Sequence, residues 1–550
     1  MQTCSSRLLV VTLCFLLLVV SAMDAVGAEP EGKKKGPRTN TDHDVKARPY
    51  LFFELHGYFR LRSDLFYRLD LGVKDTARYV LPLSENKANH RGHGANTIAG
   101  ANIRLRLEPT LNIGESWKIH AQFDVLDNLV LGSTPNFHKD SALSPLAFFT
   151  RTGAPPQDGT NSFIDSIRVK RVWAEWTLFN FLTARIGRMP HHLGLGMLHN
   201  AGRHWDSDFG DSIDRLYFEV PIPNKRIPLR IGASWDYFSE GAISTLGSDY
   251  FGQGYDLDQL DDFHQWMVIF YSKPVSVAEK DHRKEQLNSV GLKSVFIDWS
   301  VANLFRVQPL ATDRQDQRLP SLCRSVPDST SIGVLYDCYA LSARDAFFWI
   351  PDVWFSLNFQ PKRHHRFRIE AEFAYVFANI KTTQVLGGTD SRKQLRQWGL
   401  VTQLEYRYKS RLRIGLEVGV ASGDNAEFFG ILDGQNLVAA KDSEFLSTPT
   451  VANNRRVLNF KFNRDYHVDL ILFRELIGAV TNALYIKPSV HYWFIDRDGH
   501  RLGGELALIW ARALEKDATP GNVVDYGVET DLRLTYYFRE LAIARIEYGM

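Results

Sequence analysis

The chain has 550 residues, with 65 Lys and Arg against 63 Asp and Glu, 44% hydrophobic residues and only four Cys. This balance of charge argues against a nucleic-acid-binding protein, which usually carries a basic excess. The polar composition excludes a bundle of membrane-spanning helices, but it does not exclude a spanning β-barrel, because each barrel strand carries a polar residue at every second position. Composition therefore leaves a soluble protein and a membrane barrel open.

The N-terminal residues have the pattern of a cleaved secretory signal. Arg7 precedes an apolar run from Leu8 to Val20, which is too short to span a membrane comfortably, and the small residues Val26-Gly27-Ala28 follow it. Cleavage after Ala28, or after Ala22, would release the mature chain. We therefore expect a signal peptide at residues 1–28 and an exported protein.

Two further expectations concern the segment after the signal and the cysteines of the exported chain. Residues 29–49 are rich in Gly, Pro and Lys and offer almost nothing to bury, so we expect a disordered leader there and one folded domain over 50–550. Removal of the signal leaves Cys323 and Cys338 in a loop-like stretch. In an oxidising compartment this pair favours a disulfide over a metal site or a catalytic thiol.

An alternation of apolar and polar residues dominates the mature sequence. Between Glu54 and Leu71 the odd positions are mostly apolar and the even positions mostly polar, and the whole segment is long enough for a tilted strand that crosses a bilayer. About 18 such segments fit after Phe53, and 16 or 18 are the options because closed bacterial barrels have even strand numbers. The clearest segments are 99–113, 117–125, 227–237, 367–377, 398–408, 412–420, 502–510 and 526–538.

Short and long connections alternate between these segments. Short links such as 114–116 and 409–411 are followed by long polar ones such as 133–161, 306–344 and 422–455. A transmembrane barrel has short periplasmic turns and long extracellular loops. The sequence therefore predicts a single antiparallel up-and-down transmembrane β-barrel. A soluble protein built of several β-sandwiches is the alternative, but its strands would be shorter and its connections would not alternate in length.

The chain resembles Gram-negative outer-membrane channel barrels, both the general porins and the alginate-export type. The resemblance is carried by the signal, the alternating strands, and the segment that runs from Arg185-Ile-Gly-Arg188 through Leu193-Gly-Leu-Gly196 to Asp211-Ser-Ile-Asp-Arg215. It implies a location in the outer membrane, contact with lipid and lipopolysaccharide, and insertion by the barrel-assembly machinery. One departure is the C-terminus, Tyr548-Gly549-Met550, because these barrels usually end in an aromatic residue.

The charged residues of the polar face are the candidate lumen-lining residues. Arginines on two strands that are expected to be neighbours form the densest basic patch, which favours anions at that wall. The structural alternative for any single residue is a pair of opposite charges that only neutralises the wall. The full set is Arg60, Arg62, Arg104, Arg106, Glu108, Arg168, Lys170, Arg230, Arg368, Glu370, Glu405, Arg407, Arg413 and Glu417.

Two further clusters lie between residues 191 and 214. Four aspartates offer oxygen ligands for calcium, but Asp is common in loops, and four histidines have no spacing that matches a closed transition-metal site. We therefore expect neither metal nor cofactor, and no His/Ser/Asp grouping indicates an enzyme. The aspartates are Asp206, Asp208, Asp211 and Asp214, and the histidines are His191, His192, His199 and His204.

These patterns favour a passive diffusion channel for ions and small polar solutes, with a mixed-charge, arginine-rich lumen. The alternative is a conduit that exports an exopolysaccharide, as the resemblance to alginate-export barrels implies. Neither hypothesis involves nucleic acid. The sequence leaves the solute, the number of copies that associate and the possible blocking of the bore by a loop open.

Overall fold

The protein is all-β in the computed structural model, with eighteen antiparallel strands in one up-and-down sheet among the described residues. The predicted fold class and strand number are confirmed, and the eighteen include one strand before Phe53, at residues 12–18. No helix in the described part of the chain is long and apolar enough to cross a membrane. The structure describes residues 12–18, 50–67, 97–130, 167–179, 181–222, 228–238, 263–275, 279–280, 283, 294–314, 323–327, 334–362, 364–381, 392–425, 456–519, 523–539 and 541–550.

Strand order in the sheet follows the chain. Two smaller strands join it, because β11 (Cys323–Pro327) pairs with the start of β12 and β16 (Arg456–Val457) lies parallel to β14. Short helical turns are η5 (Leu472–Ile477) and η6 (Lys516–Ala518). The principal strands are β1 (Thr12–Leu18), β2 (Leu51–Tyr67), β3 (Thr97–Ile113), β4 (Trp117–Val130), β5 (Ile167–Leu178), β6 (Leu182–Pro190), β7 (Ser212–Ile222), β8 (Leu229–Phe238), β9 (Phe263–Ser272), β10 (Ser294–Arg314), β12 (Val334–Lys362), β13 (His365–Ile380), β14 (Lys393–Tyr408), β15 (Leu412–Ala421), β17 (Ala483–Arg497), β18 (His500–Ala513), β19 (Asp525–Phe538) and β20 (Ala542–Gly549).

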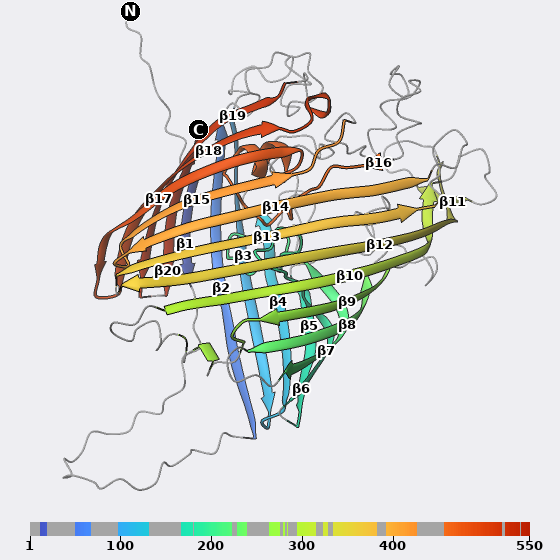
Figure 1. Cartoon of the computed structure of the whole chain (residues 1–550), viewed down its shortest axis with the longest axis horizontal. Coiled ribbons are helices and arrows are strands. Elements are labelled where there is room, and N and C mark those ends of the chain that lie inside the picture. Colours follow the sequence, from blue (N-terminus) through green and yellow to red (C-terminus); the bar gives the residue numbers. More distant parts are fainter. Residues whose placement is uncertain are drawn as a thin grey trace, which may run out of the picture.

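The sheet forms a strongly curved wall. Figure 1 shows the strands succeeding one another around it, with β2 to β6 running steeply across the view and β10 to β14 nearly horizontal. Strand β1 pairs with β20 over several residues and with β2 at Leu18 and Phe59, so it bridges the first and last strands of residues 50–550. Because β1 lies inside the predicted signal peptide, the assignment of residues 1–28 stays a prediction, as does the leader, which lies outside the described residues.

The connections alternate in length as predicted, with three corrections. Turns such as 409–411 and 498–499 join strands at one end of the sheet, and most of the longer connections join strands at the other end. The connection between β9 and β10, residues 273–293, is an exception that was not predicted, because it is long and joins strands at the short-turn end. The expected loop at 306–344 is largely strand, because β10 and β12 stay paired out to Arg314 and Tyr339. The connection expected at 422–455 extends further along the chain, because residues 458–482, after the short strand β16, form no principal strand before β17 begins at Ala483.

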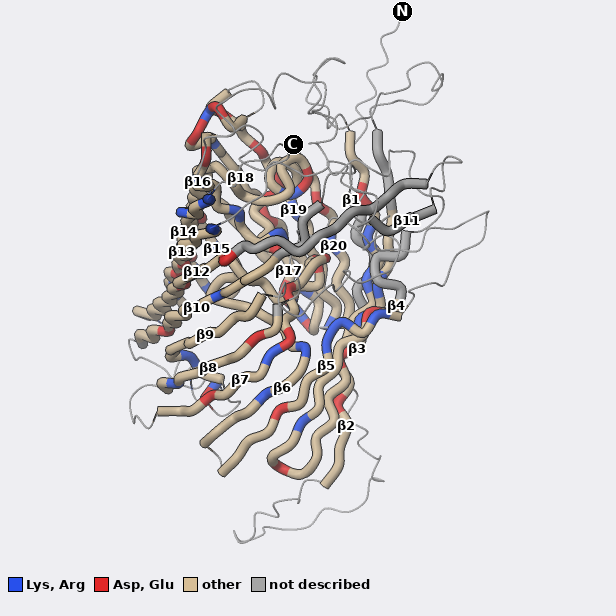
Figure 2. Tube along the Cα trace, turned by 90° about the vertical axis from the view of Figure 1, so that its right-hand side faces the viewer, with Lys and Arg blue, Asp and Glu red and all other residues tan. Residues whose placement is uncertain are grey.

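The alternation of side chains is the feature that gives the sheet two faces. On β13, Ile369 and Phe373 are about two-fifths exposed on the outer face, whereas Glu372 and Ala374 are completely buried on the inner face. Figure 2 shows charges of both signs distributed along the strands of the wall. A continuous exposed apolar face on a long-stranded sheet is typical of a surface that contacts lipid.

A packed apolar core fills part of the interior. Two connections, 191–211 and 458–482, fold inward, and Met197, Phe460 and Phe473 are at most 2% exposed. They pack with small inward residues of the wall such as Ala374 and Ala483. Full burial of a Phe or Met side chain contributes about 1.5–3 kcal/mol. The expected hydrated interior is therefore narrowed at the level of these two loops.

Candidate functional site

The predicted arginine patch lies on the inner face of β2 and β3. The register of the two strands places Arg60 directly opposite Arg104, and Arg62 and Arg106 lie on either side of this pair, opposite Asn102 and Tyr58. All four side chains are at most 6% exposed. Like charges that face each other across a strand pair destabilise it, so these arginines need acceptors close by.

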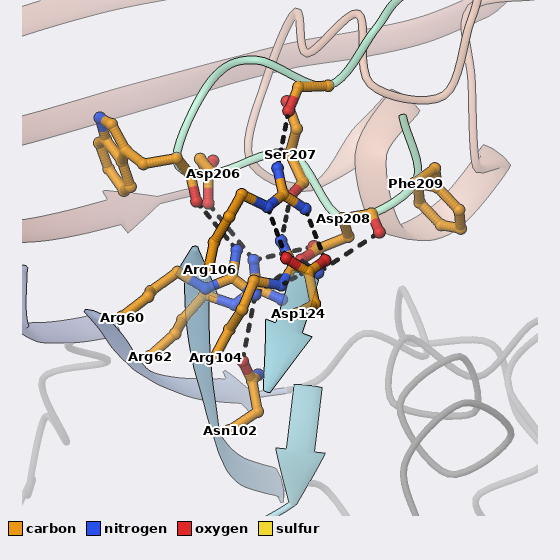
Figure 3. A network of polar contacts seen from close by, with 12 residues as sticks. Arg60, Arg62, Asn102, Arg104, Arg106, Asp124, Asp206, Ser207, Asp208 and Phe209 are labelled. Atoms are coloured by element: carbon orange, nitrogen blue, oxygen red, sulfur yellow. Dashed lines mark hydrogen bonds and ion pairs between the residues drawn. The ribbon is translucent and has the colours of Figure 1, made fainter. Parts of the chain in front are cut away.

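The inserted loop 191–211 supplies most of these acceptors. The Arg60 Nη2 and Arg62 Nη1 atoms lie 2.8 and 2.9 Å from the carboxylate oxygens of Asp208, and Arg104 Nη1 donates to the backbone carbonyl of Ser207 over 2.7 Å. Figure 3 shows the arginines reaching from the two strands toward the loop segment 206–209. The arginine patch therefore binds the carboxylate of Asp208, which belongs to the protein's own loop.

The arginines determine the charge state of this loop segment. Burial would raise the pKa of Asp208, but Arg62, Arg60 and Arg104 outweigh burial and hold that pKa well below its usual range. Burial is likewise outweighed at Asp206, where Arg474 and His467 keep the pKa well below its ordinary value. Both side chains are therefore carboxylates at neutral pH.

The other end of the loop is held by a carboxylate of the wall. Glu372 on β13 accepts hydrogen bonds from the backbone N–H groups of Leu195, Met197 and Leu198. Gly194 has φ +49°, in the left-handed region, and a Cβ atom there would lie 2.6 Å from a Glu372 oxygen. Glycine therefore permits the tight turn that points these amides at the carboxylate.

A cavity of about 760 Å³, here called the vestibule, extends from the two inserted loops to His364 and the short turn at 409–411. Ten Lys and Arg side chains line it against five Asp and Glu among the described residues. The cations are Arg366, Arg407, Lys409, Arg411, Arg413, Arg474, Lys487, Arg501, Arg533 and Arg545, and the anions are Asp206, Glu417, Asp465, Asp469 and Glu505.

Three of these cations form a row on adjacent strands. Arg366 on β13 lies opposite Arg407 on β14, which in turn lies opposite Arg413 on β15. The carboxylates nearest to the row are Glu405, 2.6 Å from Arg407 Nε, and Glu505, 2.6 Å from Arg413 Nη2. Three guanidinium groups against two carboxylates leave this stretch of the wall with a net positive charge.

The remaining predicted lumen residues are distributed over the wall. Arg230 on β8 contacts Glu279 at 2.9 Å, and Arg368 on β13 lies 3.5 and 3.8 Å from Glu370 and Glu405. These pairs fit the structural alternative, in which opposite charges neutralise the wall.

The last three predicted lumen residues, Glu108, Arg168 and Lys170, lie on β3 and β5. Glu108 accepts a hydrogen bond from Gln122, and Arg168 lies opposite Asp124 in the register of β4 and β5. Lys170 lines a small cavity of about 70 Å³ beside the loop. The structure therefore brings the predicted residues together in two places, the arginine patch and the vestibule, which Arg407, Arg413 and Glu417 line.

The four aspartates singled out in the sequence, and His199, have protein partners. Asp206 and Asp208 face arginines, Asp211 lies 3.2 Å from the Nδ1 atom of His199, and Asp214 pairs with an exposed arginine of β6. Within the described ranges no three His, Cys, Asp or Glu side chains gather as metal ligands.

The sequence analysis missed several site residues for identifiable reasons. Arg533 lies on the predicted strand 526–538, whereas Arg366 lies one residue before the predicted strand 367–377 and joins it only because the observed strand begins at His365. Asp465 and Arg474 lie in an irregular connection where no periodicity applies, so their contacts with the first loop follow only from the folded structure.

Neither known protein families nor curated protein sequences match the chain. Among solved structures it is similar to Gram-negative outer-membrane channels. The outer membrane channel DcaP of Acinetobacter baumannii has a TM-score of 0.36 and 10% identity, over 91% of this chain and 97% of DcaP.

Two further structures show the same level of similarity. OmpT, an outer membrane protein of Vibrio cholerae, has a TM-score of 0.34 and 8% identity, over 92% of this chain and 100% of OmpT. The anion-selective porin from Comamonas acidovorans has a TM-score of 0.34 and 9% identity, over 91% of this chain and 98% of the porin. Because these TM-scores are low, the function of the chain has to be inferred from its own side chains.

Proposed function

We propose that the protein is an outer-membrane channel through which small polar solutes diffuse, with a preference for anions. The observation that carries this proposal is the vestibule, where ten cationic side chains oppose five carboxylates. A cavity with one dominant sign of charge and low-dielectric walls concentrates solutes of the opposite sign. The volume of about 760 Å³ suits ions and small organic molecules.

The outer face of the sheet supports the membrane part of the proposal. Exposed apolar side chains recur at alternate positions, as at Leu506, Leu508 and Trp510 on β18. Water solvates such a band poorly, whereas the acyl chains of an outer membrane cover it without cost, with lipopolysaccharide in the outer leaflet. We therefore propose lipid and lipopolysaccharide as partners and the barrel-assembly machinery as the route of insertion.

The anion preference differs in origin from the one that the sequence analysis expected. Arg60, Arg62 and Arg104 face the carboxylate and carbonyl groups of the inserted loop, so they contribute little to the charge seen by a solute. The row Arg366, Arg407 and Arg413 lines the vestibule instead.

The test is a planar-bilayer recording of the purified protein in a salt gradient. Stable conductance steps with a reversal potential on the anion side are expected. Replacement of Arg366, Arg407 and Arg413 by Gln should move the reversal potential toward that of a non-selective pore. A protein that inserts, as shown by heat-shifted gel mobility, but carries no current contradicts the proposal.

A second candidate is export of an anionic exopolysaccharide. The cationic vestibule at the short-turn end favours it, because acidic sugar residues present the same carboxylate chemistry as small anions. Addition of an anionic oligosaccharide on the short-turn side separates the two functions. Long-lived block that grows with chain length supports the conduit, and brief block independent of length supports the diffusion channel.

A further inference from the structure

Asp465 joins the two inserted loops. Its carboxylate is fully buried and accepts hydrogen bonds from the backbone N–H groups of Asp208 and Phe209 at 3.0 and 3.2 Å, and from that of Gly210. Three consecutive amides that converge on one carboxylate form an anion-binding nest, which is a strong and directional arrangement. One side chain of the loop 458–482 therefore determines the backbone conformation of residues 208–210.

Neighbouring residues strengthen the same contact. The backbone N–H of Asn463 donates to the Met197 carbonyl over 2.6 Å, and its side-chain amide donates to Asp211 over 2.9 Å. Arg474 binds the carboxylate of Asp206 at 2.8 Å. The second loop thus contacts the first from residue 197 to residue 211.

The contact decides where the acidic side chains of the first loop lie. The backbone N–H of Asp208 donates to the Asp465 carboxylate. On the opposite side, the Asp208 carboxylate contacts Arg60 and Arg62. Without the nest, the backbone N–H groups of residues 208–210 lose the carboxylate that they share, which ties this segment directly to loop 458–482. The Asp208 carboxylate would then be held less firmly on Arg60 and Arg62, and more of the positive charge of the patch would be uncovered.

We propose that Asp465 is a selectivity-determining positioning residue, which keeps the carboxylate of Asp208 on the arginine patch and so hides that patch from solutes. This inference rests on the proposed channel function. In the wild-type protein the anion preference then comes from the vestibule alone. Loop 458–482 is then, beside loop 191–211, the second segment that narrows the channel. Loss of the Asp465 contact should expose a second anion-attracting wall and widen the path.

The experiment compares channel selectivity and conductance of Asp465 variants in planar bilayers. Asp465→Asn removes a charge and one acceptor oxygen, whereas Asp465→Glu keeps the charge but lengthens the side chain beneath the three amides. Both should raise the conductance and increase the anion-over-cation permeability ratio by about twofold or more. Glu505→Gln is the matched control, because it removes one carboxylate from the same vestibule without touching either loop.

A second comparison tests the route through Asp208. If Asp465 acts by placing Asp208, then Asp208→Asn and the double variant Asp208→Asn/Asp465→Asn should have the same permeability ratio. The inference is overturned if Asp465→Asn and Asp465→Glu change selectivity no more than Glu505→Gln, or if the two substitutions act additively. A wild-type protein that inserts but does not conduct refutes the proposed function instead, so the two failures are distinguishable.

Discussion

Arg106 and Asp124 form a bidentate ion pair between β3 and β4, with Nε to Oδ1 at 2.7 Å and Nη2 to Oδ2 at 2.8 Å. Asp124 is completely buried, and Arg106 is 6% exposed. Parallel hydrogen bonds between a guanidinium and a carboxylate are among the strongest side-chain contacts. The pair fixes one arginine of the patch to the wall, while loop 191–211 holds the others.

Removal of the Asp124 carboxylate should destabilise the folded protein strongly. Asp124→Ala leaves the Arg106 charge buried without its partner, and breaking a buried pair in this way costs about 3–5 kcal/mol. The unfolding midpoint in urea, followed by heat-shifted gel mobility, measures the effect. Asp214→Ala is the control, because its pair with Arg188 is about half exposed and such pairs contribute about 0–1 kcal/mol. Equal effects of the two substitutions would show that the Arg106 pair is not buried.

The ion pairs between Asp208 and the arginine patch should persist into mild acid. A carboxylate whose pKa is lowered by folding contributes stability above its ordinary pKa and loses it only as pH falls through the lowered value. The pKa of Asp208 is well below its usual range because arginines outweigh the effect of burial. The difference in unfolding free energy between wild type and Asp208→Asn should therefore stay constant from pH 7 to about pH 4. A difference that vanishes by pH 5 would contradict this pairing.

An arginine on the outer face should impair insertion. Leu416 lies in the middle of β15 with its side chain exposed, next to the inward Glu417. At the midplane of a bilayer, Arg on the lipid face of a barrel costs about 2–4 kcal/mol. Leu416→Arg should lower the unfolding free energy in lipid vesicles by this amount, and Leu416→Phe should leave it nearly unchanged. Wild-type stability of Leu416→Arg would place this face away from lipid.

The alternation of residues predicted the wall of the protein but not its interior. Strand positions follow from a period of two, which is a local property of the chain, and so Arg60 and Arg104 are correctly placed on the inner face. The acceptors for these arginines come from Asp208, which lies about 100 residues or more away in the chain. No local pattern encodes such a contact.

The same reason explains why the arginine patch was expected to face water. The sequence shows the charge of each wall residue, but not that loop segment 206–209 covers the arginine patch, or that Phe460, Phe462 and Phe473 fold back as a core against other strands of the wall. These residues lie in a connection without periodicity, where apolar side chains do not indicate their partners. The vestibule, by contrast, is built mostly from strand residues, and Arg407 and Arg413 were predicted from alternation alone.

The disulfide between Cys323 and Cys338 stays a prediction, and the backbone register favours it. The two residues lie directly opposite each other in the antiparallel pair of β11 and β12, and their side chains lie outside the described set. Opposite positions in such a pair have Cα atoms about 4.5–5.5 Å apart, within the range of a disulfide. The exported protein should have no reactive thiol until it is reduced, as measured by a maleimide mass shift. Labelling of both cysteines without reductant would exclude the bond.

The most direct test of the two-faced wall uses neighbouring positions on β15. Arg413 lines the vestibule, and Ile414 points outward with 44% of its side chain exposed. In a background with Cys323 and Cys338 replaced by Ser, Arg413→Cys should react with a charged, water-soluble thiol reagent and lose conductance. Ile414→Cys should resist that reagent, and a fluorophore coupled there should be quenched by nitroxide lipids. Equal reaction of both cysteines with the charged reagent, with no quenching by lipid, would contradict the account.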